Sequence, residues 1–349
     1  MERLAPEQHD TLDDVPEPAE NPVLFGHRAA LSDLAAAYRA GRLPHALLFV
    51  GPRGIGKATA AYHLANHLLR HGDPAAAPAE IAAPDPASAL FRQVASGAHP
   101  GVLHLTRPLN KEGKGFRSAL TVDEIRRINR FLSLTSHDGS YRIVIVDPAD
   151  DMNANAANAL LKNLEEPPAR TLFMLIANSP GALLPTIRSR CQVVRLAPLG
   201  AADLFEALGR AGFEAPAGDE ARDALAERSG GSVRRAIMLT QYGGLEIAEA
   251  VDRIATAKAV NVPEAHKLAD AVGGRDRAVP FELFNEHVLS LLSGTAAGAA
   301  RHGDLARAAA LSEAWREARL AIDEATTYNL DRKQHALNML FRLNDTLRM

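Results

Sequence analysis

Three features of the sequence predict an α/β fold in which a parallel sheet carries helices on both faces, followed by helical domains. A glycine-rich loop at residues 51–58 lies between an apolar run and a helical pattern, the order of elements in a P-loop fold. Further apolar runs alternate with helical segments as far as about Pro198, as in doubly wound parallel sheets. Beyond Pro198 the strand signal fades and apolar residues recur at helical spacing.

The predicted strands and helices follow one another in a regular order. Continuous apolar runs, typical of buried parallel strands, predict strands at 46–50, 102–106, 142–146, 171–177 and 192–196. Helices are predicted at 57–70, from a capping box at Thr121 to about Leu134, and at 153–166, where Pro167 ends the pattern. The Ala/Pro-rich stretch 72–88 is predicted to be a mobile loop.

The remainder of the chain is predicted to be helical. Two or three short helices are expected in 201–250, with a break at the sequence Gly-Gly-Ser, 230–232. Apolar residues at helical spacing indicate packing within a helical bundle; they are Phe281, Phe284, Val288, Leu291, Leu337, Leu340, Leu343 and Leu347. We expect a flexible acidic, Pro-rich leader at 1–20, a sheet domain at 21–198, a small helical domain at 199–250 and a larger one at 251–349.

The length, net charge and cysteine content of the chain exclude several classes of function. The 349 residues, 47% apolar, are enough for two or three domains with hydrophobic cores. A net charge of −3 is too balanced for a protein that binds nucleic acid over its whole surface. Cys191 is the single cysteine, which excludes a disulfide framework or Cys-rich zinc site and fits a reducing cytoplasm. We expect no secretory signal and no membrane span, since no apolar run approaches ~18 residues.

The glycine loop predicts a phosphate-binding site with a defect. Gly51, Gly54 and Gly56 permit close backbone approach to an anion, and Lys57 would lie against the outer phosphates. Ala58 stands where Ser or Thr would hold Mg²⁺. Thr59 follows one helical step later, rotated by about 100°, so we expect it to point away from the phosphates. Weak ATP or ADP binding stays open, no cofactor is expected to be required, and metal-dependent hydrolysis is unexpected.

The second half of the site is also incomplete. The strand at 142–146 delivers Asp147, a plausible acid on the metal side. Pro148 follows where an active ATPase of this kind would carry a carboxylate that activates water, a role that contributes ~10²–10⁴-fold. Asp150 and Asp151 are expected to lead into or cap the helix that begins near Asn153. We therefore expect no catalytic residue acting in cis.

Several strings in the chain resemble the delta-prime subunits of the bacterial DNA polymerase III clamp loader. They are Leu43-Pro44-His45-Ala46-Leu47-Leu48, Asn158-Ala159-Leu160-Leu161-Lys162, Glu165-Glu166-Pro167-Pro168, Arg188-Ser189-Arg190-Cys191 and Asn329-Leu330-Asp331-Arg332-Lys333. The string around Leu-Glu-Glu-Pro-Pro is shared with the ATPase subunits, and the defective nucleotide site favours delta-prime. The resemblance implies an AAA+ module, a helical lid and a C-terminal collar that assembles a five-subunit ring.

The resemblance also implies a role and partners. The chain would be a non-hydrolysing structural subunit beside ATPase and clamp-opening subunits in a hetero-pentamer that loads the sliding clamp onto primed DNA. Arg190 resembles an arginine finger that enters a neighbour's ATP site, where such fingers can contribute 10³–10⁵ in rate. Arg188 is the second choice, and the alternative is that Arg190 is a strand-edge arginine paired to a carboxylate.

Two further residues match nucleotide sensors of that family. Arg234 resembles an arginine of the lid that contacts nucleotide, although in a degenerate site it could serve only to hold the lid. Asn178 resembles a polar sensor of the γ-phosphate and could be vestigial. Many delta-prime proteins carry a four-cysteine zinc module after the P-loop helix, but this chain lacks those cysteines, so neither zinc nor another metal is expected.

Alternatives to the structural role stay open. An active, motor-type ATPase subunit is supported by Lys57 and Asp147 and opposed by Ala58 and Pro148. A nucleotide kinase would leave the Leu-Glu-Glu-Pro-Pro string and the helical C-terminal third unexplained. A basic stretch at 106–118, with Arg107, Lys111, Lys114 and Arg117, could face DNA phosphates or be a solvated loop.

Overall fold

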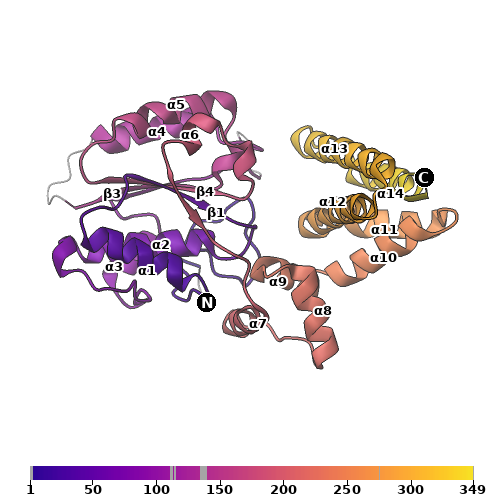
Figure 1. The fold of residues 1–349 in the computed structure, drawn as a ribbon, viewed down its shortest axis with the longest axis horizontal. Helices are drawn as coiled ribbons and strands as arrows, with labels where there is room; N and C mark the ends of the chain where they lie inside the picture. The colour runs from indigo at the N-terminus through magenta and orange to yellow at the C-terminus, as the bar shows by residue number, and fades with distance from the viewer. Residues whose placement is uncertain (1–2, 111–112, 114, 134–139, 275, 349) are drawn as a thin grey trace. The chain divides into compact units, whose positions relative to one another are not determined.

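The computed structural model describes residues 3–110, 113, 115–133, 140–274 and 276–348. The chain forms two compact units, Met1–Arg234 and Arg235–Met349 (Figure 1). The first contains the predicted sheet, and the second contains the long C-terminal helices. The domain boundaries predicted at 198 and 250 stay predictions. Within the described ranges, no helix has both the length and the apolar character needed to cross a membrane.

The first unit contains a five-stranded sheet whose strands all run parallel, as predicted. Its order is β2-β3-β4-β1-β5. The strands are β1 (Ala46–Val50), β2 (Val102–Leu105), β3 (Arg142–Val146), β4 (Thr171–Ala177) and β5 (Gln192–Arg195). Three strands have the predicted bounds, and β2 and β5 end one residue earlier than predicted.

Helices cover both faces of the sheet (Figure 1). One face carries α1 (Arg28–Arg39), α2 (Lys57–Arg70) and α3 (Ala89–Ala95), and the other carries α4 (Val122–Ser133), α5 (Ala154–Glu165) and α6 (Pro185–Arg188). Successive strand residues point to opposite faces, so Leu47 and Phe49 join the core under α2 while Leu48 and Val50 join the core under α5. The sheet is therefore buried on both sides, which explains its continuous apolar strands.

The helices α1 and α3 were not predicted from the sequence, whereas α2 has the predicted bounds and α5 is one residue shorter at each end. Asn153 caps α5, because its Oδ1 accepts a hydrogen bond from the Ala156 amide at 2.9 Å. The helix α4 is described as far as Ser133, and the predicted end at 134 lies outside the described residues. In the Ala/Pro-rich stretch, one 3₁₀ turn (Pro74–Ala76) is capped by Asp73.

Three short helices follow the sheet: α7 (Ala201–Arg210), α8 (Asp219–Ser229) and α9 (Val233–Gln241). The predicted break at 230–232 separates α8 from α9. Gly230 and Gly231 both have positive φ, at 57° and 72°, which glycine adopts without steric cost. This turn aims the start of α9 back toward the glycine loop.

The second unit is a helical bundle of α10 (Gly244–Thr256), α11 (Val262–Gly273), α12 (Ala278–Arg301), α13 (Leu305–Thr327) and α14 (Arg332–Arg348). Most of the predicted apolar residues are buried in it, including Phe284 and Leu340, but Leu292 rather than Leu291 faces the core. The Asn344 side chain donates to the Ile254, Ala255 and Ala257 carbonyls at 2.8–3.2 Å and so ties α14 to the end of α10.

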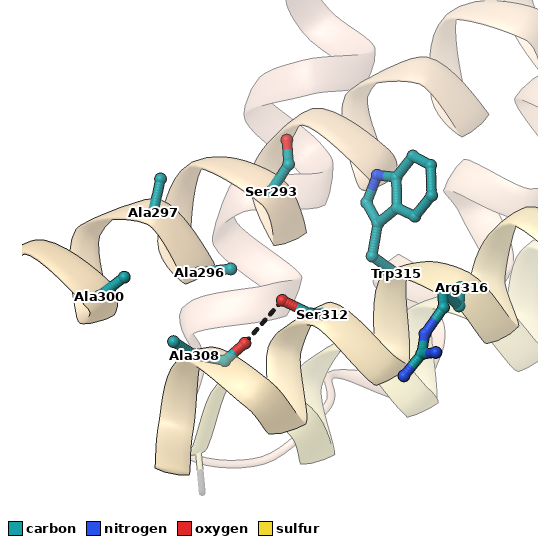
Figure 2. Close-up of a pocket in the computed structure, with 8 residues that line it drawn as sticks. All are labelled: Ser293, Ala296, Ala297, Ala300, Ala308, Ser312, Trp315 and Arg316. Atoms are coloured by element: carbon teal, nitrogen blue, oxygen red, sulfur yellow. Dashed lines mark hydrogen bonds between the residues drawn. The ribbon is translucent and has the colours of Figure 1, made fainter. Parts of the chain in front are cut away.

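Between α12 and α13 lies a groove of about 460 Å³ lined mainly by small residues and Trp315 (Figure 2). The Ser312 hydroxyl there donates to the Ala308 carbonyl at 2.7 Å, within α13. The short side chains of Ala296, Ala297 and Ala300 line the α12 side of the groove.

A pair of adjacent leucines tests whether the Asn-Ala-Leu-Leu-Lys string is structural. Leu160 is fully buried under the sheet, whereas Leu161 is only partly buried. We expect Leu160→Ala to lower the free energy of unfolding by about 2–5 kcal/mol, because the cavity cannot fully collapse, and Leu161→Ala to cost less than half as much. Urea unfolding followed by circular dichroism measures both. Equal losses would contradict the structural interpretation.

Candidate nucleotide site and arginine finger

The glycine loop lies at the carboxyl end of β1, where the sheet order reverses. The strand β1 pairs with β4 on one side and β5 on the other, while β2, the next strand in the chain, lies at the far edge. Ligands of open α/β sheets bind at such switch points. Gly56 precedes α2 with φ 99°, so the loop enters the helix through a conformation that favours glycine.

Lys57 is buried and held by the protein's own acceptors. Its Nζ donates to the Pro52 carbonyl at 2.6 Å and to Asn178 Oδ1 at 2.8 Å, and 4% of the residue is exposed. Burial lowers the pKa of Lys57 to about 8, although the charges of Asp147 and Asp150 oppose this shift. The structure thus brings together two predicted site residues, Lys57 and Asn178, that lie 121 positions apart.

Asp147 follows β3 as predicted and is within electrostatic range of Lys57. Burial raises its pKa to about 7; the charge of Asp10 acts in the same direction, and Lys57 opposes it. Because metal ligands must be deprotonated, a metal ion that bound at Asp147 would displace the proton that this carboxyl group partly retains near neutral pH. Ala58 and Thr59 add no metal ligand, because Ala58 has only a methyl group and Thr59 is buried in α2.

Asp150 leads into α5 as one of the two predicted alternatives has it, in the 3₁₀ turn Ala149–Asp151, but it does not cap the helix, because Asn153 does. Asp150 instead accepts hydrogen bonds from the backbone amides of Asn178 at 3.2 Å and Ser179 at 2.8 Å. It therefore joins the turn after β3 to the end of β4 and fixes the position of Asn178. A carboxylate that already accepts hydrogen bonds from two backbone amides is poorly suited to act as the general base that a carboxylate at position 148 would provide.

Asp151 does not cap α5 either, because it forms an ion pair with Arg107. Arg107 belongs to the basic stretch 106–118, for which a DNA-facing surface and a solvated loop are the two alternatives, so one cation of that stretch has an intramolecular partner. Lys111 and Lys114 of that stretch lie outside the described residues.

The lid residue Arg234 lies directly against the glycine loop. Its backbone amide donates to the Gly54 carbonyl at 3.4 Å. Gly54 has φ 77°, and a Cβ at this position would lie 2.4 Å from Arg234 Cβ and 2.5 Å from Ser232 Oγ. Close contact between the loop and the start of α9 therefore requires glycine here.

The stretch predicted to be a flexible leader is placed against the same site. In the described residues 3–20, Asp10 Oδ2 lies 3.0 Å from Arg53 Nη2 of the glycine loop. The Asp10 carbonyl accepts a hydrogen bond from the Arg234 guanidinium. His27, which precedes α1, contacts the loop from another side, with Nε2 2.7 Å from the Ile55 carbonyl.

The candidate finger Arg190 lies at the surface after α6 and contacts residues of α5 and α6. Its Nη2 lies 2.6 Å from Glu165 Oε1, and Nη1 donates to the Thr186 carbonyl at 2.9 Å. About a third of the Arg190 side chain, 35%, is exposed. Arg188, the second choice, is exposed at the end of α6. In the isolated chain Arg190 thus has the carboxylate partner that the alternative interpretation predicts.

A metal site needs several His, Cys, Asp or Glu side chains close together. Among the residues that the structure describes, no three His, Cys, Asp or Glu side chains are grouped so as to hold a metal ion. Cys191 is buried, and burial raises the pKa of its thiol to about 11.

Comparison with known proteins places the chain in a family. Residues 26–200, half of the chain, match the family described as "DNA polymerase III, delta subunit". A DNA polymerase III subunit delta' from Pseudomonas aeruginosa is 41% identical over 189 residues, covering 54% of this chain and 53% of the relative. The chain belongs to the delta-prime family.

A second curated relative agrees with this assignment. A DNA polymerase III subunit delta' from Escherichia coli is 34% identical over 174 residues, covering 49% of this chain and 48% of the relative. The chain thus spans about half the length of these curated delta-prime relatives. A solved structure of a DNA polymerase III gamma subunit-related protein from Thermotoga maritima has 19% identity and a TM-score of 0.40, covering 89% of this chain and 98% of that one.

Sequence reasoning missed three groups that shape the delta-prime site. The sequence predicts that Asp10 lies in a leader and that Asp150 leads into or caps α5, and no prediction is made for His27. Of the three, only the role of Asp150 could have been anticipated from the sequence. Asn153 is a good N-cap residue for α5, so Asp150 was not needed as a cap and was available for another contact.

Gly54 allows a test of the contact between loop and lid. Gly97 has a similar φ of 71°, but a Cβ there would meet no atom of the described residues within 4 Å. Gly97→Ala should therefore cost only the strain of positive φ, about 1 kcal/mol, while Gly54→Ala should cost at least about 2 kcal/mol more because Ser232 and Arg234 must move. Chemical denaturation measures both. Similar costs would show that the loop and the lid are not in tight contact at Gly54.

Proposed function

We propose that this delta-prime chain is a non-hydrolysing structural subunit of a clamp loader and acts beside an ATPase subunit. Its partners would be the ATPase and clamp-opening subunits of a hetero-pentamer, together with the sliding clamp and primed DNA. Family membership supports the clamp-loader role. The proposal that the chain does not hydrolyse ATP rests on Ala58 and Pro148, which stand where a hydrolysing subunit would have a hydroxyl and a carboxylate. The nearby Asp150 already accepts hydrogen bonds from backbone amides.

The geometry of Arg190 supports a finger supplied in trans. The guanidinium is partly exposed, and its partner Glu165 is also about half exposed, at 49% of the side chain. Exposed ion pairs of this kind contribute only about 0–1 kcal/mol, so exchanging Glu165 for a neighbour's phosphate would cost little. Glu165 would then orient Arg190 in the isolated subunit and release it in the assembly.

The absence of intrinsic turnover is the first expected outcome. Purified chain mixed with ATP, Mg²⁺ and primed DNA should release no phosphate above background, because Ala58 cannot hold the metal and Pro148 cannot activate water. A continuous phosphate-release assay measures this. Turnover that Lys57→Ala abolishes would instead favour the motor-type ATPase.

The finger is tested in a reconstituted loader. Arg190→Ala should leave assembly intact, as judged by gel filtration, and should slow hydrolysis at the adjoining ATP site on the order of 10³-fold or more. Single-turnover phosphate release resolves that site from the others. Glu165→Gln is the matched control, since it removes the ion pair but keeps the arginine, and turnover should persist.

Two results would change the assignment. Loss of turnover with Arg188→Ala but not with Arg190→Ala would move the finger to Arg188. Unchanged turnover with both variants would leave Arg190 as a structural partner of Glu165.

A further inference from the structure

The N-terminal segment (residues 3–20) is held together by two buried carboxylates. Glu17 accepts hydrogen bonds from Arg3, Gln8 and Thr11. Glu20 accepts from the backbone amides of residues 4, 5 and 17 at 2.7–3.1 Å. These contacts link positions up to 16 residues apart and give the segment a defined path.

The segment is anchored to the first unit by apolar contacts. Ala5 and Ala19 belong to the core that lies between the sheet and α2, and Leu12 is 3% exposed. His63 Nε2 of α2 lies 3.0 Å from the carbonyl of Asn21, the residue that follows the segment. The anchors on either side of Asp10 therefore fix where this residue lies.

Asp10 lies between two arginines that belong to the nucleotide site. Its carboxylate pairs with Arg53 of the glycine loop at 3.0 Å, and its carbonyl accepts from Arg234 of the lid. Burial acts to raise the pKa of Asp10, but the charges of Arg234, His9 and Arg53 outweigh it and bring the pKa to about 2. Asp10 is thus an anion at neutral pH, and guanidinium groups bind carboxylate and phosphate in the same way.

The charge of Asp10 also reaches Asp147, since it contributes to the raised pKa of that carboxyl group. Asp10 is therefore within electrostatic range of the loop, the lid and the acid that follows β3. These are the three parts of the site that would contact a bound nucleotide.

We propose that the N-terminal segment is an internal ligand of the nucleotide site: Asp10 occupies an anion position between Arg53 and Arg234, and the segment closes the glycine loop to nucleoside triphosphates. Binding of ATP requires the arginines to exchange Asp10 for phosphate. The measured affinity of a site that is open only a fraction of the time is reduced by that fraction. The inference concerns binding and does not depend on whether the chain hydrolyses ATP.

Binding of a fluorescent ATP analogue to the full chain tests this directly. Asp10→Ala and Asp10→Asn should each tighten binding by about tenfold or more, because the open state becomes more populated. Glu7→Ala is the matched control; it removes the same charge from an exposed position three residues away and should bind like the unchanged chain. Adding Lys57→Ala to Asp10→Ala should remove the gain and so locate binding at the glycine loop.

A second measurement follows the segment itself. Saturating ATP should increase amide hydrogen exchange at positions 8–12, since the nucleotide displaces them, and should leave exchange in the β4 strand unchanged. Circular dichroism and thermal unfolding would establish that each variant is folded.

Distinct outcomes overturn the proposal. Unchanged or absent binding in both Asp10 variants would show that the segment excludes nothing. Weaker binding would show that the segment forms a wall of the pocket. Neither result bears on turnover, and phosphate release by the unchanged chain would contradict the non-hydrolysing role without affecting the competition between Asp10 and nucleotide.

Discussion

The parallel pairing of β1 with β4 is the constraint on which the rest of the site depends. Its register sets Val50 beside Ala177, so the residues that follow these strands meet at one edge of the sheet. Lys57 and Asn178 are thereby brought to 2.8 Å from each other. The pairing of β3 with β4 adds Asp150, which holds the Asn178 backbone. Movement of one strand end would disturb all of these contacts together.

The site keeps groups that bind anions and differs at two positions from the residue pattern of a hydrolysing P-loop site. Glycines, Lys57 and the lid arginine are present around the loop, whereas Ala58 and Pro148 replace the hydroxyl and the base. The polar groups of the site also bond to one another. Lys57 donates a hydrogen bond to Asn178, and Asp150 accepts hydrogen bonds from the backbone amides of Asn178 and Ser179.

The Leu-Glu-Glu-Pro-Pro string has a physical explanation in this fold. Leu164 packs in the core under the sheet, Pro167 follows the end of α5, and Glu165 projects to the surface and pairs with Arg190. The string therefore connects the core of the sheet domain to the candidate finger. The string thus helps to set where the Arg190 guanidinium lies on the surface of the chain.

The sequence by itself determined the strands, the glycine loop, the helical C-terminal part and the presence of Ala58 and Pro148, because each depends on local apolar spacing or on residue identity at one position. Tertiary structure alone decided the strand order, the engagement of Asp150, the partner of Arg190 and the place of Asp10. Those features join residues far apart in the chain, as with Asp10 and Arg234, 224 positions apart. A local sequence pattern cannot predict such contacts. They form only when distant segments pack together and bring their charged groups to the same edge of the sheet.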